Sequence, residues 1–382
     1  MKKQLISFLT VMAAVAVVTV SCDRHADPST PEVSLNPANC HVVSTPGTYA
    51  FQAVKGKSSE LVSGVASVEI LWESFGTSEV PAKGDILAEA RYTASDGRIH
   101  FKTPSKLKDG NALIAAKDAS GNILWSWHIW VCEGWDPGKT AHTYYNDAGI
   151  MMDRNLGATS VTPGDVKSLG LLYQWGRKDP FLGASSITER VLAASTLNWP
   201  EPLMSNAQTG TIAYAIAHPT TFIASVEDNY DWYYTGDFVT DNTRWQEDID
   251  LYDPCPAGWT LPDGPTPTES GFWYTVYRQR LMSVDFDVEK RGMNFTKVFG
   301  DADPIWFPLA GCRADDNGKI WSVGDNCGLW TSTPDYDEED PIARVMALGL
   351  DLRTFSETEL SVFTAMDYCR AVGYSVRCVA EK

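Results

Sequence analysis

The reactive side chains of this chain are scattered rather than arranged in a catalytic motif. There is no Gly-x-Ser-x-Gly, no His-Glu-x-x-His, no phosphate-binding glycine loop and no EF-hand spacing. The six histidines stand singly: His25, His41, His100, His128, His142 and His218. A single histidine within an aromatic strand, such as His128, is usually a core or edge residue. The sequence therefore predicts no catalytic residue, no metal site and no cofactor, and we expect a protein that is not an enzyme.

The densest group of carboxylates lies in a proline-bounded segment, at Asp335, Asp337, Glu338, Glu339 and Asp340. A solvated loop is the simpler interpretation, and a Ca²⁺ site is the alternative because hard oxygen ligands suit that ion. The tripeptides with which calcium-dependent lectins coordinate sugars (Glu-Pro-Asn, Gln-Pro-Asp and Trp-Asn-Asp) are absent. The sequence therefore does not predict sugar binding through calcium.

The most concentrated group of aromatic side chains lies between residues 230 and 245. It comprises Tyr230, Trp232, Tyr233, Tyr234, Phe238 and Trp245. No strand or helix period organises these rings, and carboxylates and amides lie between them. On an exposed loop they would form a recognition surface, with Tyr230, Trp232, Tyr233, Tyr234 and Trp245 as candidate ligand-binding residues. The alternative is a satellite core, and the solvent exposure of Trp232 and Tyr234 decides between the two.

The N-terminus has the pattern of an export signal. Lys2 and Lys3 precede an apolar stretch over 5–20, and Ser21-Cys22 follows. This stretch of about 16 residues is shorter than the roughly 20 that span a bilayer, so we expect a signal peptide at 1–21. Cys22 after a small residue resembles a lipobox, although Thr19 stands where Leu or Val is usual. We therefore expect Cys22 to carry lipid.

The charge of the chain limits its partners. Loss of Lys2 and Lys3 with the signal peptide changes the formal net charge from −18 to about −20. An acidic surface without a basic run repels phosphate groups, which excludes nucleic acid as a partner. The expected partner is the outer membrane, through the N-terminal lipid. The polar, proline-interrupted residues 22–36 predict a lipidated tether.

Residues 37–134 have the spacing of a small β-sandwich. Strands are predicted at 48–54, 68–73, 98–102, 112–116 and 123–131. Turn signals lie at 95–97 and at 118–122, where Asp118 to Asn122 indicate a hairpin. Strands at this spacing predict a mainly β, immunoglobulin-like sandwich domain.

Residues 135–382 predict an α+β domain. Helices are expected at 186–195, 209–217 and 269–282, with the second ending before Pro219. Short strands are expected at 305–309, 319–321, 328–331, 343–348 and 374–378. Asp316-Asn317-Gly318 predicts a tight turn.

An ordered series of motifs in this second domain resembles a known family. Its parts are Met152–Ala158 (MDRNLGA), Gly170–Phe181 (GLLYQWGRKDPF), Tyr252–Trp259 (YDPCPAGW), Phe307–Gly311 (FPLAG) and Ser375–Val379 (SVRCV). The series is similar to the Fibrobacter succinogenes major paralogous domain, which is common in Bacteroidetes surface lipoproteins. The resemblance implies a C-type-lectin-like fold, distantly related to formylglycine-generating enzymes. Large apolar anchors such as Trp175 and Trp259 are expected in its core.

The first domain resembles the β-sandwich module of fimbrillin-associated proteins. The residues that carry this likeness are Ala38–Cys40, Gly110–Ala112 and Leu124–Trp130. Together the two resemblances cover roughly 36–382 and imply surface attachment rather than an activity.

Seven cysteines remain after Cys22, none in a Cys-x-x-Cys pair: Cys40, Cys132, Cys255, Cys312, Cys327, Cys369 and Cys378. Disulfides are the default in an exported protein. Cys255 and Cys378 both lie in motifs of the resemblance, which implies a bond between them. Cys312 and Cys327 form either a second disulfide or, as in formylglycine-generating enzymes, a copper-binding pair. A Cys40–Cys132 bond would join the first and last strands of the sandwich, leaving Cys369 as the odd thiol.

Two functions follow from these expectations. The first is a lipid-anchored surface protein with an adhesive or fimbria-associated role, whose partner is a host-matrix component or a fimbrial subunit. The second is a surface glycan-binding lipoprotein of a nutrient-uptake system. A formylglycine-generating-enzyme-like oxidase is a third and weaker reading.

The lipid anchor is directly testable. Cys22→Ala removes the thiol that would be acylated, so the protein should move from the membrane fraction to the soluble fraction. Cell fractionation followed by immunoblotting measures this, and membrane association unchanged by the substitution would contradict the prediction.

Overall fold

The computed structural model describes most of the chain beyond the predicted signal and the first part of the tether. The described residues are 32–144, 147–226, 229–234, 236, 241–245, 249–264, 271–277, 283–296, 305–335, 346–354 and 360–382. The signal segment 1–21 and Cys22 lie outside them. Residues Glu32–Lys382 form one compact unit. Among the described residues, no helix has the length and apolar character needed to cross a membrane.

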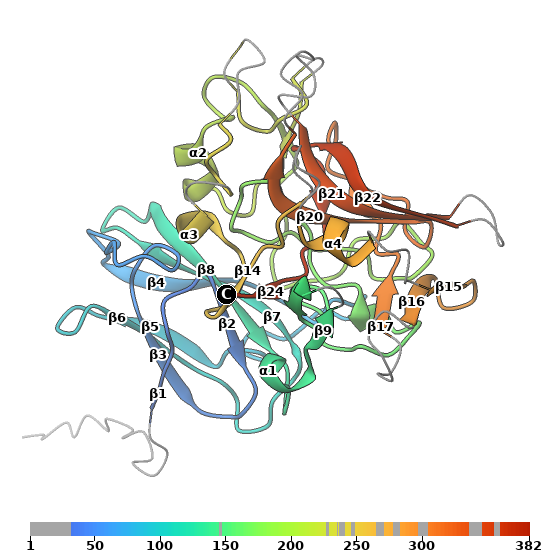
Figure 1. Ribbon diagram of the computed structural model, residues 1–382. Coiled ribbons are helices and arrows are strands. Elements are labelled where there is room, and N and C mark those ends of the chain that lie inside the picture. Colours follow the sequence, from blue (N-terminus) through green and yellow to red (C-terminus); the bar gives the residue numbers. More distant parts are fainter. Residues whose placement is uncertain are drawn as a thin grey trace, which may run out of the picture. The chain divides into compact units, whose positions relative to one another are not determined.

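The N-terminal part consists of two four-stranded sheets (Figure 1). The first has the order β1 (Val33–Ser34), β3 (Thr48–Gln52), β6 (Arg98–Lys102), β5 (Glu89–Thr93). The second has the order β2 (Cys40–Val43), β8 (Ile123–Val131), β7 (Gly110–Lys117), β4 (Ser67–Ser74). All five strands predicted in this region are present, and the hairpin predicted at 118–122 joins β7 to β8.

Buried apolar side chains from the two sheets form one cluster. Tyr49, Phe51 and Phe101 come from the first sheet, and Ile114 and Trp127 from the second. The rings of Phe51 and Trp127 meet edge to face with centroids 5.3 Å apart, an arrangement that aromatic pairs prefer. The N-terminal part is therefore a β-sandwich.

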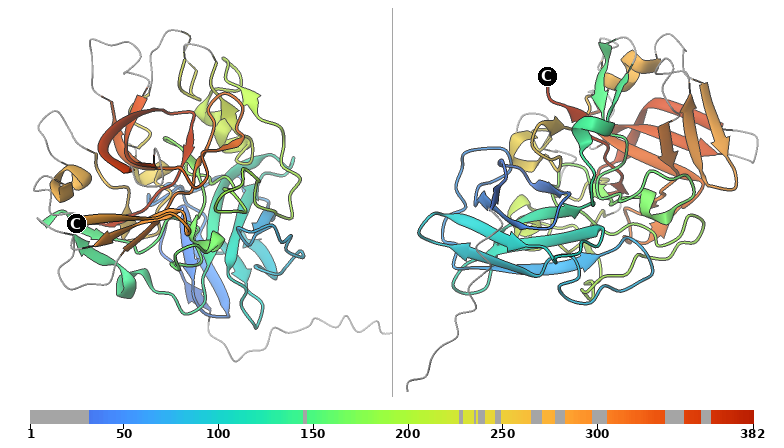
Figure 2. Two further views of the ribbon diagram at one scale, coloured as in Figure 1. Left: turned by 90° about the vertical axis from the view of Figure 1, so that its right-hand side faces the viewer. Right: turned by 90° about the horizontal axis from the view of Figure 1, so that it is seen from below.

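The C-terminal part is built from several small sheets. Two sheets have four strands each, in the spatial orders β14 (Trp259–Thr260), β24 (Val379–Ala380), β10 (Gly149–Met151), β9 (His142–Tyr144) and β11 (Tyr173–Gln174), β23 (Gly373–Tyr374), β18 (Cys312–Arg313), β19 (Ile320–Trp321). Two sheets have three strands each, in the orders β15 (Ser283–Asp287), β16 (Gly292–Thr296), β17 (Ile305–Pro308) and β20 (Asn326–Pro334), β21 (Met346–Thr354), β22 (Leu360–Cys369). The last sheet pairs β12 (Leu203–Met204) with β13 (Ile223–Ala224). Register irregularities in β20 and β21 accompany the strong curvature of the β20–β21–β22 sheet (Figure 2). The structure is 39% strand and 7% helix.

The helices are shorter than the sequence patterns indicate, and only two of the three expected helices are found. Four α-helices are described: α1 (Pro137–Thr140), α2 (Ile212–Ala217), α3 (Ile249–Tyr252) and α4 (Phe272–Tyr277). α2 and α4 lie within the helices expected at 209–217 and 269–282. The helix expected at 186–195 is wrong. Ser186 Oγ instead accepts hydrogen bonds from the backbone N–H groups of Thr188 and Glu189, a local bond that competes with helix formation.

Several short strands of the C-terminal part also match expectation. β17, β19 and β20 overlap the strands predicted at 305–309, 319–321 and 328–331. The strand predicted at 343–348 overlaps β21 from Met346 on, and its first three residues lie outside the described chain. The one predicted at 374–378 overlaps β23 at Tyr374 alone, and the next residue, Ser375, forms a single parallel bridge to Leu329 of β20. Trp175 and Trp259 are buried, as expected.

The sandwich and the C-terminal part share one core. Cys40, Trp72 and Trp130 of the sandwich belong to the same buried cluster as Trp175 and Trp330. Hydrogen bonds cross the same boundary: the indole N–H of Trp130 donates to the carbonyl of Ala158 at 3.1 Å. The change of pattern at residue 134 is therefore a boundary in topology, with continuous packing across it.

The chain's C-terminal end lies beside the sandwich (Figure 1). The ammonium group of Lys57, in the loop after β3, pairs with Asp253 at 2.8 Å and with Glu381 at 2.6 Å. Asn39 donates to the carbonyls of Leu251 and Asp253 at 2.8 and 2.9 Å. Two residues of the sandwich, Asn39 and Lys57, thus contact the segment just before Cys255, and Lys57 also contacts the C-terminal end.

Of the three predicted disulfides, the structure contains Cys255–Cys378, with its Cα atoms 6.1 Å apart. Cys312 and Cys327 are free thiols, so the pairing predicted for them is wrong. A β-bridge joins Gly311 to Cys327 in parallel, and adjacent residues of a strand point to opposite faces. Cys312 accordingly packs in the cluster of Trp330 and Cys327 in a second cluster, with Leu329.

The predicted Cys40–Cys132 bond is also wrong, although the strands concerned do pair. β2 runs parallel to β8 with Cys40 opposite His128, four positions before Cys132. At about 3.3 Å per residue this offset separates the two Cα atoms by more than about 13 Å, whereas a disulfide requires less than about 7 Å. Cys369 is free, as expected of the odd thiol.

The Cys255–Cys378 bond closes a loop with a sequence separation of 123 residues. Because a long loop loses much chain entropy on closure, the double variant Cys255→Ala/Cys378→Ala should lower the free energy of unfolding by about 3–5 kcal/mol. Urea unfolding of the variant and the parent measures this. The parent reduced with dithiothreitol is the control, and mass spectrometry of a non-reduced digest should recover the linked peptides. Free thiols at both positions would contradict the assignment.

Candidate functional site

In the described residues of the aromatic segment 230–245, both tryptophans belong to a satellite core and not to an exposed platform. Trp232 is 1% exposed and Trp245 is fully buried. Their indole N–H groups donate to the carbonyls of Trp175 and Tyr252 at 2.8 and 2.9 Å. Both rings therefore have their apolar surface and their single donor satisfied inside the protein, and the ligand-binding role predicted for them is wrong.

The polar residues of this segment are also used internally. The Arg244 guanidinium pairs with Asp231 at 2.6 Å, with both side chains buried, and lies 4.8 Å from the ring centre of Trp232. Tyr230, Tyr233 and Tyr234 are half-buried, and Phe238 lies outside the described residues. Asp231 and Arg244 thus form a buried ion pair beside aromatic rings of the same segment. They are not part of an exposed recognition surface.

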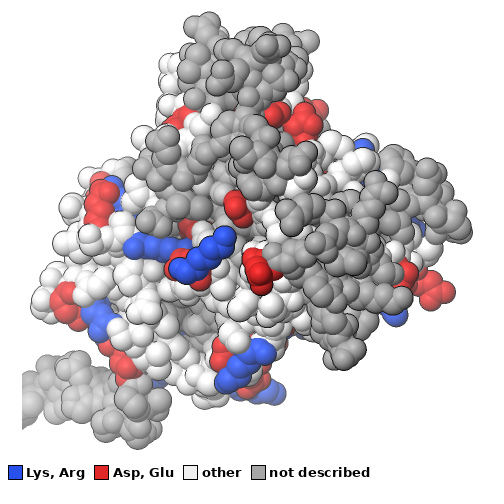
Figure 3. Space-filling view, viewed as in Figure 1, with Lys and Arg blue, Asp and Glu red and all other residues white. Residues whose placement is uncertain are grey.

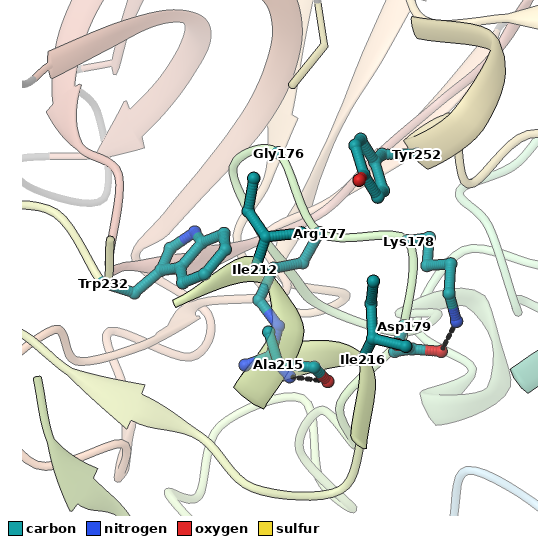
Figure 4. Close-up of a pocket in the computed structure, with 9 residues that line it drawn as sticks. All are labelled: Gly176, Arg177, Lys178, Asp179, Ile212, Ala215, Ile216, Trp232 and Tyr252. Atoms are coloured by element: carbon teal, nitrogen blue, oxygen red, sulfur yellow. Dashed lines mark hydrogen bonds and ion pairs between the residues drawn. The ribbon is translucent and has the colours of Figure 1, made fainter. Parts of the chain in front are cut away.

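A small depression next to this cluster lies at the junction with the sandwich (Figure 4). Its lining includes Arg177, Lys178, Asp179 and Trp232. Lys178 donates to Asp179 at 2.7 Å and to the hydroxyl of Ser126 in β8 at 2.6 Å. Arg177 donates to the carbonyl of Thr221 at 2.9 Å and the side-chain oxygen of Gln174 at 2.8 Å. Because Arg177 and Lys178 already have hydrogen-bond partners within the protein, we assign this depression a structural role in packing the two parts together.

A cysteine, a histidine and an asparagine form a hydrogen-bonded series in the shared core. Cys40 Sγ lies 3.3 Å from His128 Nδ1, and His128 Nε2 lies 2.9 Å from Asn111 Oδ1. The Asn111 amide N–H₂ donates to the carbonyl of Gly157 at 2.8 Å, so its oxygen faces the histidine and accepts. The thiol therefore donates to Nδ1 of a neutral imidazole.

Residue types and order in this series are those of a cysteine nucleophile with its base, but the environment is unsuited to that chemistry. All three side chains are 1% exposed. Burial, with a smaller contribution from Asp253, raises the pKa of the Cys40 thiol well above its ordinary value. Burial, with a smaller contribution from His41, lowers the pKa of His128 to about 3. The thiolate–imidazolium pair is disfavoured, and the series serves as buried polar packing.

The exposed candidate is a groove between the β18–β19 hairpin and the segment 190–202. It encloses about 1310 Å³, including the open space above it. Its lining comprises Arg190, Leu192, Trp199, Pro200, Glu201, Pro202, Arg313, Ala314, Asn317, Gly318, Lys319, Ile320 and Trp321. The predicted turn at Asp316–Gly318 shapes one wall. Gly318 has φ +65°, and a Cβ there would lie 2.8 Å from the Phe222 ring, so only glycine fits without strain.

Two tryptophans of different exposure line this groove. β19 alternates, so that Ile320 is buried and Trp321 is 52% exposed. The Arg190 guanidinium stacks 3.5 Å from the Trp321 ring centre. Trp199 is half-buried, packs against Trp72 with ring centres 5.7 Å apart, and donates its N–H to Ser195 Oγ. The Trp199 ring is thus held in place by its contacts within the protein, whereas the Trp321 ring is exposed to solvent.

The third feature of the groove is a buried arginine. Arg313 in β18 is 6% exposed, and its Nε donates to the carbonyl of Gly318 at 2.7 Å. The guanidinium lies 5.0 Å from the ring centre of Phe222 and 5.5 Å from that of Phe181. Its Nη1 has no hydrogen-bond partner among the described residues. Burial lowers the pKa of Arg313 to about 10, which leaves it charged at pH 7.

The groove is more basic than the chain as a whole. It presents Arg190, Arg313 and Lys319 against one carboxylate, Glu201, in a chain of net charge −18. None of the three cations has a carboxylate within ion-pair distance in the described part of the chain. On the face viewed in Figure 3, by contrast, the described acidic and basic side chains lie interspersed.

The sequence patterns did not single out Trp321, Arg190 or Arg313. One signal was present, because an apolar strand that presents a tryptophan on its outward position beside a tight turn is unusual. The acidic segment 335–340 lies outside the described residues after Asp335. Among those that are described, no group of three or more His, Cys, Asp or Glu side chains is placed to hold a metal ion.

Comparisons with known proteins add no relative: no family profile matches the chain, and neither a curated protein nor a solved structure is significantly similar to it.

The buried histidines predict a pH dependence of stability. Burial lowers the pKa of both His41 and His128 to about 3, whereas in the unfolded chain the value is about 6.5. The unfolded state therefore binds more protons between these values, and stability present above pH 6.5 is lost as the pH falls toward 3. Each histidine contributes up to about 1.4 kcal/mol per pH unit.

His128→Gln removes one of these two groups. Between pH 7 and pH 4 its free energy of unfolding should fall by roughly 2–4 kcal/mol less than that of the parent. Urea titrations at the two pH values measure the difference, which is independent of the baseline stability that the substitution costs. An equal fall in both proteins would show that His128 is not held neutral by burial.

Proposed function

We propose that this chain is a lipid-anchored protein of the outer membrane, exposed on the cell surface, that acts as an adhesive or fimbria-associated binding module without catalysis. The observation that carries the proposal is the groove between 190–202 and the β18–β19 hairpin. It combines a tryptophan with half of its surface exposed and three cations that have no carboxylate partner among the described residues, a combination of aromatic and arginine side chains that is typical of binding sites. Export by the expected signal peptide and lipid attachment at Cys22 would carry this groove out of the cytoplasm, as the proposed role requires.

The strand order supports an immunoglobulin-like assignment for the sandwich. The sheets β1-β3-β6-β5 and β2-β8-β7-β4 follow the order of the two sheets of constant-type immunoglobulin domains, with β2 as an added edge strand. The C-type-lectin-like architecture of the C-terminal part rests on the motif resemblance. Its second strand, β10, pairs with its last strand, β24, which is compatible with that assignment.

A glycan-binding lipoprotein of a nutrient-uptake system is the second candidate. The specific observation in its favour is the pair Trp199 and Trp321 in one groove, because flat ring faces are suited to stacking against sugar rings. The genes next to this one distinguish the two roles. Fimbrial assembly genes favour adhesion, and glycan transporters and hydrolases favour uptake.

The free thiols argue against the oxidase reading. Cys312 and Cys327 lie in different core clusters, and burial raises the pKa of the Cys312 thiol to about 12 and that of Cys327 to about 11. Buried thiols that stay protonated at neutral pH are poor metal ligands and poor nucleophiles.

The groove assignment is tested with the detergent-purified full chain on an array of glycans and host-matrix proteins. Trp321→Ala should reduce binding to the retained ligands at least tenfold while leaving the melting temperature within about 2 °C, because an exposed side chain contributes little to folding. Phe363→Ala is the matched control: this aromatic in β22 is 39% exposed and does not line the groove. Equal loss in both variants, or none in Trp321→Ala, would contradict the assignment.

A further inference from the structure

We infer that the groove binds an acidic saccharide, with a sugar ring stacked on Trp321 and the anionic group paired with Arg313. This inference rests on the proposed function, which requires only that the groove be a binding site. It adds the chemical class of the ligand: a saccharide that bears a carboxylate or sulfate group.

Arg313 carries the argument for negative charge. A guanidinium that is 6% exposed has lost nearly all of its water, and buried charges are normally paired. The carboxylate of Asp315, two residues along the chain, accepts from Ser225 Oγ at 3.0 Å, and neither Asp315 nor the adjacent Asp316 is within ion-pair distance of Arg313 among the described residues. The Phe181 and Phe222 rings and the Gly318 carbonyl compensate only in part. An anion in the groove would pair with this charge through the part of the guanidinium that lines the groove, in the geometry that suits a planar guanidinium.

Trp321 and Trp199 carry the argument for a ring-shaped ligand. Arg190 covers one face of the Trp321 ring at 3.5 Å, so the 52% of the side chain that remains exposed belongs to the other face and the edge. A small inorganic anion would leave this apolar surface uncovered. A sugar ring offers both an apolar face for the indole and hydroxyl groups for polar neighbours such as Asn317 and Glu201.

The remaining charges of the groove fit this class of ligand. Lys319 and Arg190 are exposed at its rim and supply further positive charge. Glu201 is the single carboxylate of the lining. It would repel a ligand charged along its whole length and tolerate one whose charge is localised beside Arg313.

The test uses an array of matched pairs, in which each carboxylated oligosaccharide is accompanied by its neutral methyl ester, together with sulfated glycans. The detergent-purified full chain should bind acidic members at least tenfold more tightly than their esters, as measured by titration calorimetry of the retained pairs. Arg313→Gln should remove this preference. Arg313→Lys, which keeps the charge, should retain part of it. Because Arg313 is buried, the exposed Lys319→Gln serves as a second variant, with a smaller loss expected.

Four outcomes would overturn the inference. Equal binding of acids and esters that still depends on Trp321 would leave the groove as a binding site and refute the acidic ligand. Inorganic sulfate competing as well as the sulfated glycans would show an anion site without saccharide specificity. No saccharide bound, while a matrix protein binds through Trp321, would refute the saccharide alone. Absence of any Trp321-dependent binding would refute the proposed function as well.

Discussion

The buried carboxylate of Asp253 is the group on which the arrangement of the two parts depends. It is 1% exposed and accepts hydrogen bonds from the ammonium of Lys57 and from the backbone N–H of Cys255, both at 2.8 Å. Burial raises its pKa even though Lys57 acts in the opposite direction, so the carboxylate is kept charged at a cost. Removing it would leave Lys57, 10% exposed, without its main partner, a change that costs several kcal/mol in comparable buried pairs. Sandwich, disulfide and C-terminus therefore form one cooperative unit.

Local patterns predicted the sandwich well and the C-terminal part less well, for a physical reason. The strands at 98–102 and 123–131 coincide with β6 and β8, because alternation and a turn signal are properties of a few neighbouring residues. The disulfides depend on register: Cys40 and Cys132 lie on paired strands, yet a parallel alignment offsets them by four positions. The order and spacing of the residues do not reveal the register of β2 against β8, so the distance between the two cysteines could not be predicted. The Cys255–Cys378 bond was predicted because a motif resemblance supplied what spacing did not.

The candidate site was mispredicted because exposure is a tertiary property. The aromatic segment 230–245 has the composition of a recognition loop, yet Arg244 and Asp231 neutralise each other among its rings and draw the segment into the core. The groove that replaces it joins residues more than a hundred positions apart. Its decisive side chain, Arg313, is distinguished only by Nη1, which has no hydrogen-bond partner among the described residues. A missing interaction leaves no trace in a sequence pattern. The one indication of the groove in the sequence was the strand at 319–321, in which Ile320 is buried and the next residue, Trp321, is exposed.

The parallel pairing of β2 with β8 has a mechanical consequence. If the chain is anchored through Cys22 and binds a ligand in the groove, as proposed, tension would enter at the N-terminus and be resisted at the ligand in the C-terminal part. β1 has only two residues paired with β3, so it would detach first and lengthen the tether by roughly 20 Å. The load would then reach β2 from its N-terminal end, while β8 is pulled from its C-terminal end. Because the strands are parallel, the four residue pairs from Cys40–His128 to Val43–Val131 are sheared together rather than opened one by one. Under load, the sandwich would thus first lengthen as β1 detaches, and the β2–β8 pairing would then resist further extension.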